Sequence, residues 1–114
     1  MSAQKQSWMV DNIFEGANAM WFFNDEEREL KRVCHDFAQK ELAPLAAKHD
    51  EDETFNLAAF KKMADIGVLG ITASPDYGGA GLGATAATIA MEEFGRVCAS
   101  TTLSYLAHSI LCVN

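Results

Sequence analysis

The sequence predicts an all-α domain, and three observations carry that prediction. Apolar residues recur at helical spacing in several segments, alternating strand-like patterns are almost absent, and the segments are separated by residues that begin or end helices. The chain has 114 residues, of which 49% are hydrophobic and 22% are charged. This length is typical of one domain with a buried core, and the composition excludes a disordered tail.

The first predicted helix covers residues 25–42. Asn24 precedes three acidic residues and stands three positions before Glu27, which predicts a helix N-cap with a capping box. The apolar residues that then share one helical face are Leu30, Val33, Cys34, Phe37 and Ala38. We expect Glu27 to pair with Lys31 one turn later, and Pro44 to end or kink the helix near Leu42-Ala43.

Three further helices are predicted at residues 56–66, 84–98 and 101–114, with an irregular, glycine-rich loop over 74–83. Residues 1–23 are treated as an N-terminal extension that contains an apolar helix. The apolar pattern continues to the last residues without a helix stop signal. We therefore expect the domain, residues 24–114, to be truncated within its last helix.

The charge pattern narrows the classes of partner. Sixteen acidic and nine basic residues give a net charge of -7, which disfavours nucleic acid as a partner. Residues 97–114 contain no Asp, Glu, Lys or Arg, and such a run is long enough to raise the possibility of a membrane span. Serine, threonine, histidine and asparagine interrupt it, so we expect no membrane span but a helix surrounded by protein on most sides.

Two motifs resemble catalytic or binding sites but have simpler explanations. The segment from Gly79 to Ala84 matches the G-x-G-x-x-A dinucleotide fingerprint, yet Pro75-Asp76-Tyr77 precedes it in place of a strand. A tight connector between helices is the better interpretation.

Glu92 and Glu93 are adjacent on a helix and point about 100° apart, so they cannot flank one substrate bond. We expect one to meet Arg96 and the other to reach a neighbouring domain.

Cysteine and histidine residues do not predict a metal site. Cys34, Cys98 and Cys112 lack metal-ligand spacing, and three unpaired cysteines suit free thiols packed as small apolar side chains. The histidines are scattered along the chain, and His108 is expected to be a buried structural residue.

A combination of short motifs makes a family recognisable. The segments Gly67–Thr72 and Asp76–Gly83, followed by Met91-Glu92-Glu93, together resemble the N-terminal helical domain of the acyl-CoA dehydrogenases. Residues 103–114 are most similar to the isovaleryl-CoA dehydrogenase branch of that family, and the resemblance covers about residues 22–114.

The resemblance implies an orthogonal helix bundle that belongs to a larger, three-domain flavoenzyme. Such enzymes use FAD to dehydrogenate an acyl-CoA, here a short or branched one, in fatty-acid or leucine catabolism, and they pass the electrons to electron-transfer flavoprotein. It also implies a homotetramer in the mitochondrial matrix of a eukaryote or the cytoplasm of a bacterium. The family's catalytic base and main flavin contacts come from regions beyond this domain, so we assign no catalytic, cofactor-binding or metal residue here and expect the 114-residue chain alone to be inactive.

By the same resemblance, Leu103 and Ala107 occupy positions that shape the distal end of the acyl pocket. Their spacing places both on one helical face, which we expect to be turned away from solvent in the full-length enzyme. The alternative is a non-catalytic helical interaction module whose uncharged last helix docks a protein partner.

Overall fold

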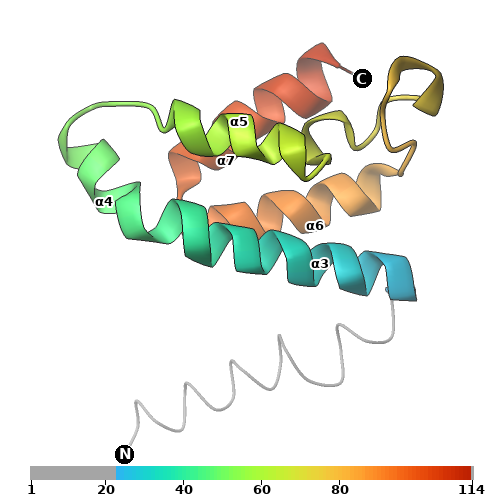
Figure 1. The fold of residues 1–114 in the computed structure, drawn as a ribbon, viewed down its shortest axis with the longest axis horizontal. Helices are drawn as coiled ribbons and strands as arrows, with labels where there is room; N and C mark the ends of the chain where they lie inside the picture. The colour runs from blue at the N-terminus through green and yellow to red at the C-terminus, as the bar shows by residue number, and fades with distance from the viewer. Residues whose placement is uncertain (1–22, 114) are drawn as a thin grey trace, which may run out of the picture.

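The computed structural model describes residues 23–113, and every regular element in that range is a helix, so the all-α prediction is confirmed (Figure 1). The helix expected within residues 1–22 lies outside the described residues. The α-helices are α3 (Asp25–Phe37), α4 (Ala43–Glu51), α5 (Leu57–Asp65), α6 (Ala84–Gly95) and α7 (Ala99–Leu106). The shorter elements are the π-helices η1 (Ala38–Leu42) and η4 (Ala107–Cys112) and the 3-10 turns η2 (Val68–Gly70) and η3 (Pro75–Tyr77).

Helix α3 begins with the predicted capping box. The backbone N–H of Glu27 donates to Asn24 Oδ1 over 2.8 Å, and the backbone N–H of Asn24 donates to Glu27 Oε2 over 3.0 Å. Both bonds satisfy donors that the first turn of a helix leaves unpaired. The expected pairing of Glu27 with Lys31 is wrong, because Glu27 serves the cap and Lys31 reaches across to α6.

Pro44 does not end the first helix, so that one of the two predicted outcomes, and the predicted end at residue 42, are wrong. The helix continues through η1 into α4, as far as Glu51. Within the π turn the backbone N–H of Ala43 bonds to the carbonyl of Ala38, five residues earlier. Pro44 thereby falls in the first turn of α4, directly after the π turn, where the α pattern of hydrogen bonds is already interrupted.

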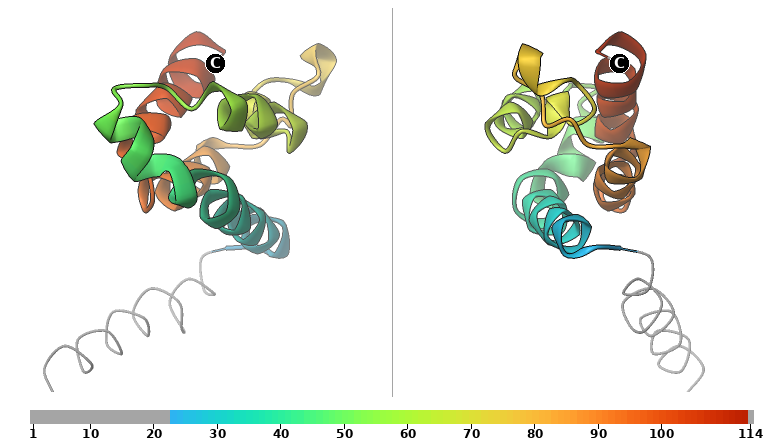
Figure 2. Two further views of the ribbon diagram at one scale, coloured as in Figure 1. Left: turned by 60° about the vertical axis from the view of Figure 1, so that its left-hand side comes forward. Right: turned by 90° about the vertical axis from the view of Figure 1, so that its right-hand side faces the viewer.

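Helix α6 is the centre of the domain. It packs against α3, beside which it lies in Figure 1, and it also packs against α7, the next helix in the chain (Figure 2). The Phe94 ring is fully buried and meets the edge of Phe37 at 5.9 Å and of Tyr105 at 5.3 Å between ring centroids. The other core residues around it are Cys34, Ala38, Leu42, Ala59, Met63, Val68 and Ala90.

The glycine-rich loop is a tight connector, as predicted. The carbonyl of Ala73 accepts a hydrogen bond from the N–H of Gly81 over 2.8 Å, and a Cβ on Gly79 would stand 2.1 Å from that same carbonyl oxygen. Gly79 is therefore needed for a close backbone approach within the loop. In residues 23–113 no strand precedes it, so the match to the dinucleotide fingerprint is not a nucleotide-binding turn.

Candidate functional site

Helix α7 and its continuation η4 have two unlike faces. Thr101, Tyr105 and Ser109 point inward and are at most 2% exposed. On the opposite face Leu103 is 66% exposed, and Ala107 is exposed one turn later. The two candidate pocket residues share a face as their spacing predicts, but that face is open to solvent in this chain. The expectation that this face is turned away from solvent concerns the full-length enzyme and stays a prediction; in this chain the hydrogen-bonded Thr101, Tyr105 and Ser109 take the inner positions.

Polar contacts attach the inner face to the segment between α5 and η3. The Tyr105 hydroxyl donates to the carbonyl of Val68 over 3.1 Å, and Ser109 Oγ donates to the carbonyl of Leu69 over 3.0 Å. Thr72 Oγ1 donates to the carbonyl of Ser109 over 3.4 Å. Burial raises the pKa of Tyr105 to about 12, so this hydroxyl remains a donor at any physiological pH. The exposed face of α7 and η4 therefore rests on a fixed support.

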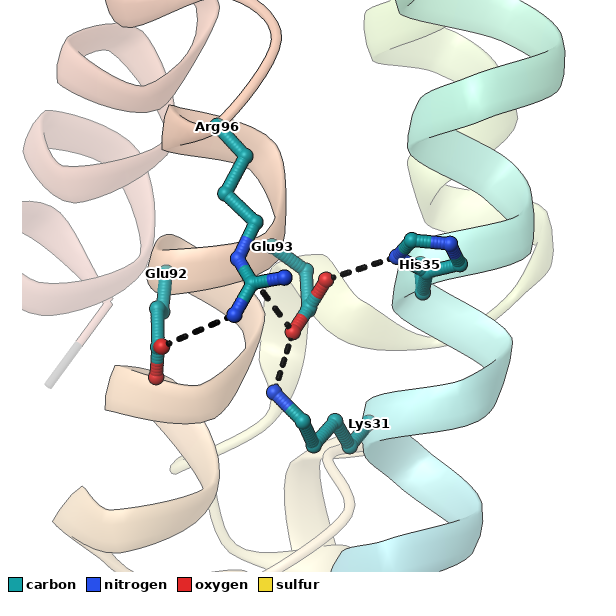
Figure 3. A network of polar contacts seen from close by, with 5 residues as sticks. All are labelled: Lys31, His35, Glu92, Glu93 and Arg96. Carbon is teal, nitrogen blue, oxygen red and sulfur yellow. Dashed lines mark hydrogen bonds and ion pairs between the residues drawn. The ribbon is translucent and has the colours of Figure 1, made fainter. Parts of the chain in front are cut away.

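A second polar group links α3 to α6 (Figure 3). Glu93 is 1% exposed, and its carboxylate pairs with Lys31 Nζ and lies 3.0 Å from Nδ1 of His35. Arg96 Nε stands 3.9 Å from Glu93, and Arg96 also pairs with Glu92 at 3.4 Å. The expected pairing with Arg96 is confirmed. The other carboxylate reaches a neighbouring helix of the same domain, which corrects the expected contact with a neighbouring domain.

The surroundings of Glu93 favour a structural role. Burial by itself would raise the pKa of its carboxyl, but hydrogen bonds from Lys31 and His35, together with the charges of Lys31 and Arg96, hold that pKa below its ordinary value. Glu93 is thus ionised at neutral pH, and both of its oxygens are engaged. A general base needs a pKa near the working pH and an oxygen free to accept a proton. Glu93 and its partners Lys31, His35 and Arg96, here called the Glu93 cluster, instead hold α3 against α6.

Cysteine and histidine residues are dispersed in the structure as in the sequence. Cys34 is buried, and Cys98 is half-buried, as expected of packed thiols, whereas Cys112 is exposed and contradicts that expectation. His108 is half-buried, with its ring edge-on to Phe60 at 5.8 Å. Among residues 23–113, no group of three His, Cys, Asp or Glu side chains could hold a metal ion. In the same range, no helix has the length and apolar character needed to cross a membrane.

Sequence reasoning did not foresee a hollow of about 620 Å³ at the other end of the domain. It lies between α4, the connector to α5 and the start of α7, and its lining includes Ala46, His49, Thr54, Phe55, Val97 and Thr101. The side chains of His49 and Thr54 are hydrogen-bonded to each other over 2.8 Å. Residues far apart in the sequence form this hollow, so no local sequence motif predicts it. Neither Leu103 nor Ala107 lines it.

Comparison with known proteins gives the family. The model of the acyl-CoA dehydrogenase N-terminal domain matches residues 24–114. Mitochondrial isovaleryl-CoA dehydrogenase of Bos taurus is 45% identical over 93 residues, which are 80% of this chain and 22% of that protein. The corresponding protein of Pongo abelii is 44% identical over 107 residues, 92% of this chain and 24% of that protein.

A bacterial relative extends the comparison. The short-chain specific acyl-CoA dehydrogenase of Clostridium acetobutylicum is 38% identical over 89 residues, 78% of this chain and 24% of that protein. The chain thus spans about a quarter of the length of these curated relatives. The match over residues 24–114 shows that the chain belongs to the acyl-CoA dehydrogenase family of oxidoreductases and contains its N-terminal domain.

Proposed function

We propose that this chain is the N-terminal part of an FAD-dependent acyl-CoA dehydrogenase that removes hydrogen from Cα and Cβ of a short or branched acyl-CoA. The isovaleryl-CoA and short-chain dehydrogenases among its relatives support this substrate range, with isovaleryl-CoA as the first candidate. Within the enzyme, the exposed face of α7 and η4 supplies one wall of the acyl pocket. Leu103 and Ala107 are the residues of that wall that shape its distal end.

One observation carries the pocket assignment: a helix without charged residues turns two large apolar side chains outward on the face that carries Ala107. Leu103 and Leu111 are 66% and 73% exposed, while the inner face is occupied by a hydroxyl-bearing row. A hydrocarbon acyl tail needs no polar contact, and such a face offers it none. The depth of an apolar pocket discriminates chain length by about 1–3 kcal/mol per methylene. A large residue and a small one, a turn apart, would set that depth.

The family is generally FAD-dependent, but the glycine-rich segment of this chain is not built as a dinucleotide-binding turn. Their glycine-rich segment folds against the backbone of Ala73, which leaves no cradle for a phosphate at Gly79. We therefore assign flavin binding and the catalytic base to the remainder of the enzyme, and expect the 114-residue chain to be inactive. Flavin added to the chain should be lost on gel filtration, and retained flavin absorbance would contradict this assignment.

The same proposal covers the partners and the location of the enzyme. The electrons pass to electron-transfer flavoprotein, and the full-length enzyme is a homotetramer. The relatives described as mitochondrial support the mitochondrial matrix as the location in a eukaryote, and the Clostridium relative supports the cytoplasm in a bacterium.

Substitutions in the full-length enzyme test the pocket assignment. Ala107→Leu should fill the pocket, so that longer or branched acyl-CoA substrates lose about 1–3 kcal/mol of transition-state binding while short, straight ones change little. Leu103→Ala should open space for longer chains. The measurement is kcat/KM across a series of acyl-chain lengths. Ala64→Leu, the same change at an exposed position of α5, is the matched control. Equal losses for every substrate would overturn the assignment.

A further inference from the structure

We propose that Ser109 is a positioning residue for acyl-chain selectivity. Together with Thr72 it holds the π-helix η4 in place, and η4 keeps Ala107 and Leu111 in line with Leu103 on the outer face. Ser109 itself is fully buried on the inner face, so it acts on the acyl pocket only through the helix that carries it. This inference rests on the proposed function, because it concerns the shape of the same pocket wall.

The first step is the geometry of a row of residues four apart. An α-helix has 3.6 residues per turn, so such a row drifts around the helix by about 40° at each step, or about 80° from residue 103 to residue 111. A π-helix holds more residues in each turn and corrects this drift. The backbone changes from α to π at Ala107, midway along the row. Leu103 and Leu111 consequently stay on one side, both strongly exposed.

The π turn also corrects the drift of the row of residues on the inner face. Thr101, Tyr105 and Ser109 are also four residues apart, and they are 2%, 0% and 0% exposed. In a continuous α-helix Ser109 would lie about 80° around the helix from Thr101, toward the edge of the inner face. The π-helix therefore serves both faces at once, holding the hydroxyl row inward and the apolar row outward over three turns.

The second step is the set of contacts that favours the π form. In an α-helix the backbone N–H of Val113 would bond to the carbonyl of Ser109. Here it bonds to the carbonyl of His108 over 3.1 Å, five residues back. The carbonyl of Ser109 accepts the Thr72 hydroxyl, and the Ser109 hydroxyl donates to the carbonyl of Leu69. Two bonds from the loop thus meet the helix at Ser109, the residue whose carbonyl the N–H of Val113 bypasses.

The third step is the consequence for selectivity. Without these two bonds η4 would gain from returning to the α form, which would rotate Leu111 relative to Leu103 and change the outline of the pocket wall. Small displacements of groups that position a substrate have large kinetic effects. The effect should depend on the shape of the acyl tail, because only the tail would meet this wall.

The test is Ser109→Ala in the full-length enzyme, with Ser104→Ala as the matched control. Ser104 lies on the same helix, but its hydroxyl donates to the carbonyl of Ser100 within α7 and makes no bond to the loop. For Ser109→Ala we expect the ratio of kcat/KM between branched and straight acyl-CoA substrates to change by about three- to tenfold, with KM affected more than kcat. Ser104→Ala should leave this ratio unchanged.

A second pair of variants covers the case in which Ser109→Ala does not fold. Thr72→Val removes the hydroxyl while keeping the shape of the side chain, and should change the ratio in the same direction. Thr72→Ser keeps the hydroxyl and should restore the original ratio. If the Thr72 variants leave the ratio unchanged, or if either hydroxyl deletion lowers kcat/KM equally for all substrates, the inference is overturned.

The outcome is distinguishable from failure of the proposed function. If Ala107→Leu changes the chain-length profile and the hydroxyl deletions do not, the pocket wall stands and Ser109 has no positioning role. If Ala107→Leu has no selective effect either, the wall assignment fails, and the positioning role fails with it.

Discussion

Helices α6 and α7 follow each other in the chain and pack side by side, yet they use their side chains in opposite ways. Helix α6 buries apolar residues such as Ile89 and Phe94 and leaves the charged Glu92 in solvent, with the ion-paired Glu93 as its one buried charge. Helix α7 buries a threonine and a tyrosine and exposes Leu103. An amphipathic helix at a protein surface normally resembles α6.

The difference shows that burial in this domain follows available partners as well as hydrophobicity. The inner positions of α7 face carbonyl groups of the loop after α5, and hydroxyl side chains satisfy them. Leu103 and Leu111 are thereby directed outward. Under the proposed function, this exposed face is the wall of the acyl pocket.

The largest expected effect comes from exchanging one apolar residue in each helix for alanine. Phe94→Ala should lower the free energy of unfolding by about 4 kcal/mol, because it empties a fully buried ring site between Phe37 and Tyr105. Leu103→Ala should cost less than about 0.5 kcal/mol, since the side chain is mostly solvated. Urea unfolding of the 114-residue chain measures both. A cost above about 1 kcal/mol at Leu103 would show that the outer face is already packed.

A smaller effect is expected within α6, between its adjacent carboxylates. Glu93→Gln removes the charge that Lys31, His35 and Arg96 surround and should cost about 2 kcal/mol. Glu92→Gln affects one exposed pair, worth about 0.5 kcal/mol or less. The same unfolding assay compares the two. Equal losses in the free energy of unfolding for the two variants would mean that the Glu93 cluster does not hold α3 against α6.

The smallest effect is the pH dependence of the difference in the free energy of unfolding between wild type and Glu93→Gln. The pKa of Glu93 is lower in the folded chain than in the unfolded chain, so the unfolded chain binds more protons in the interval between the two values. The stabilisation is complete above the ordinary glutamate pKa of about 4.3 and is lost as the pH falls through the folded value. Acidification should therefore reduce the difference in the free energy of unfolding between wild type and Glu93→Gln. A gap that stayed constant on acidification would contradict the ion-pair account.

Local signals predicted most of the fold. The capping box at Asn24, the periodic apolar face of the first helix and the glycines of the connector act through neighbours in the sequence. The structure confirms the cap and the connector, and it places every residue of the predicted face except the half-buried Val33 in the core or against it. Pro44 misled the prediction because its effect depends on the backbone before it. A π turn can absorb a proline, and nothing in the residue pattern announces that turn.

The candidate site was predictable in part. The spacing of Leu103 and Ala107 placed them on one face, but the side of the helix that is buried depends on the carbonyls of Val68 and Leu69, more than 30 residues earlier in the chain. Glu93 is a similar case, because its partners on α3 are about 60 residues away. Periodicity indicates which residues lie together on a helix, whereas distant partners decide which face is buried.

The exposed thiol at the end of η4 makes the outer face open to chemical observation. Burial, with the nearby charge of Glu93, raises the pKa of Cys34 to about 12, so this thiol does not react at neutral pH. Cys112 stands in solvent beside Leu111, where a maleimide or a fluorescent label can reach it. The chain therefore carries a native labelling site next to its apolar face, and a slower labelling rate would report when another part of the enzyme, or a partner, covers that face.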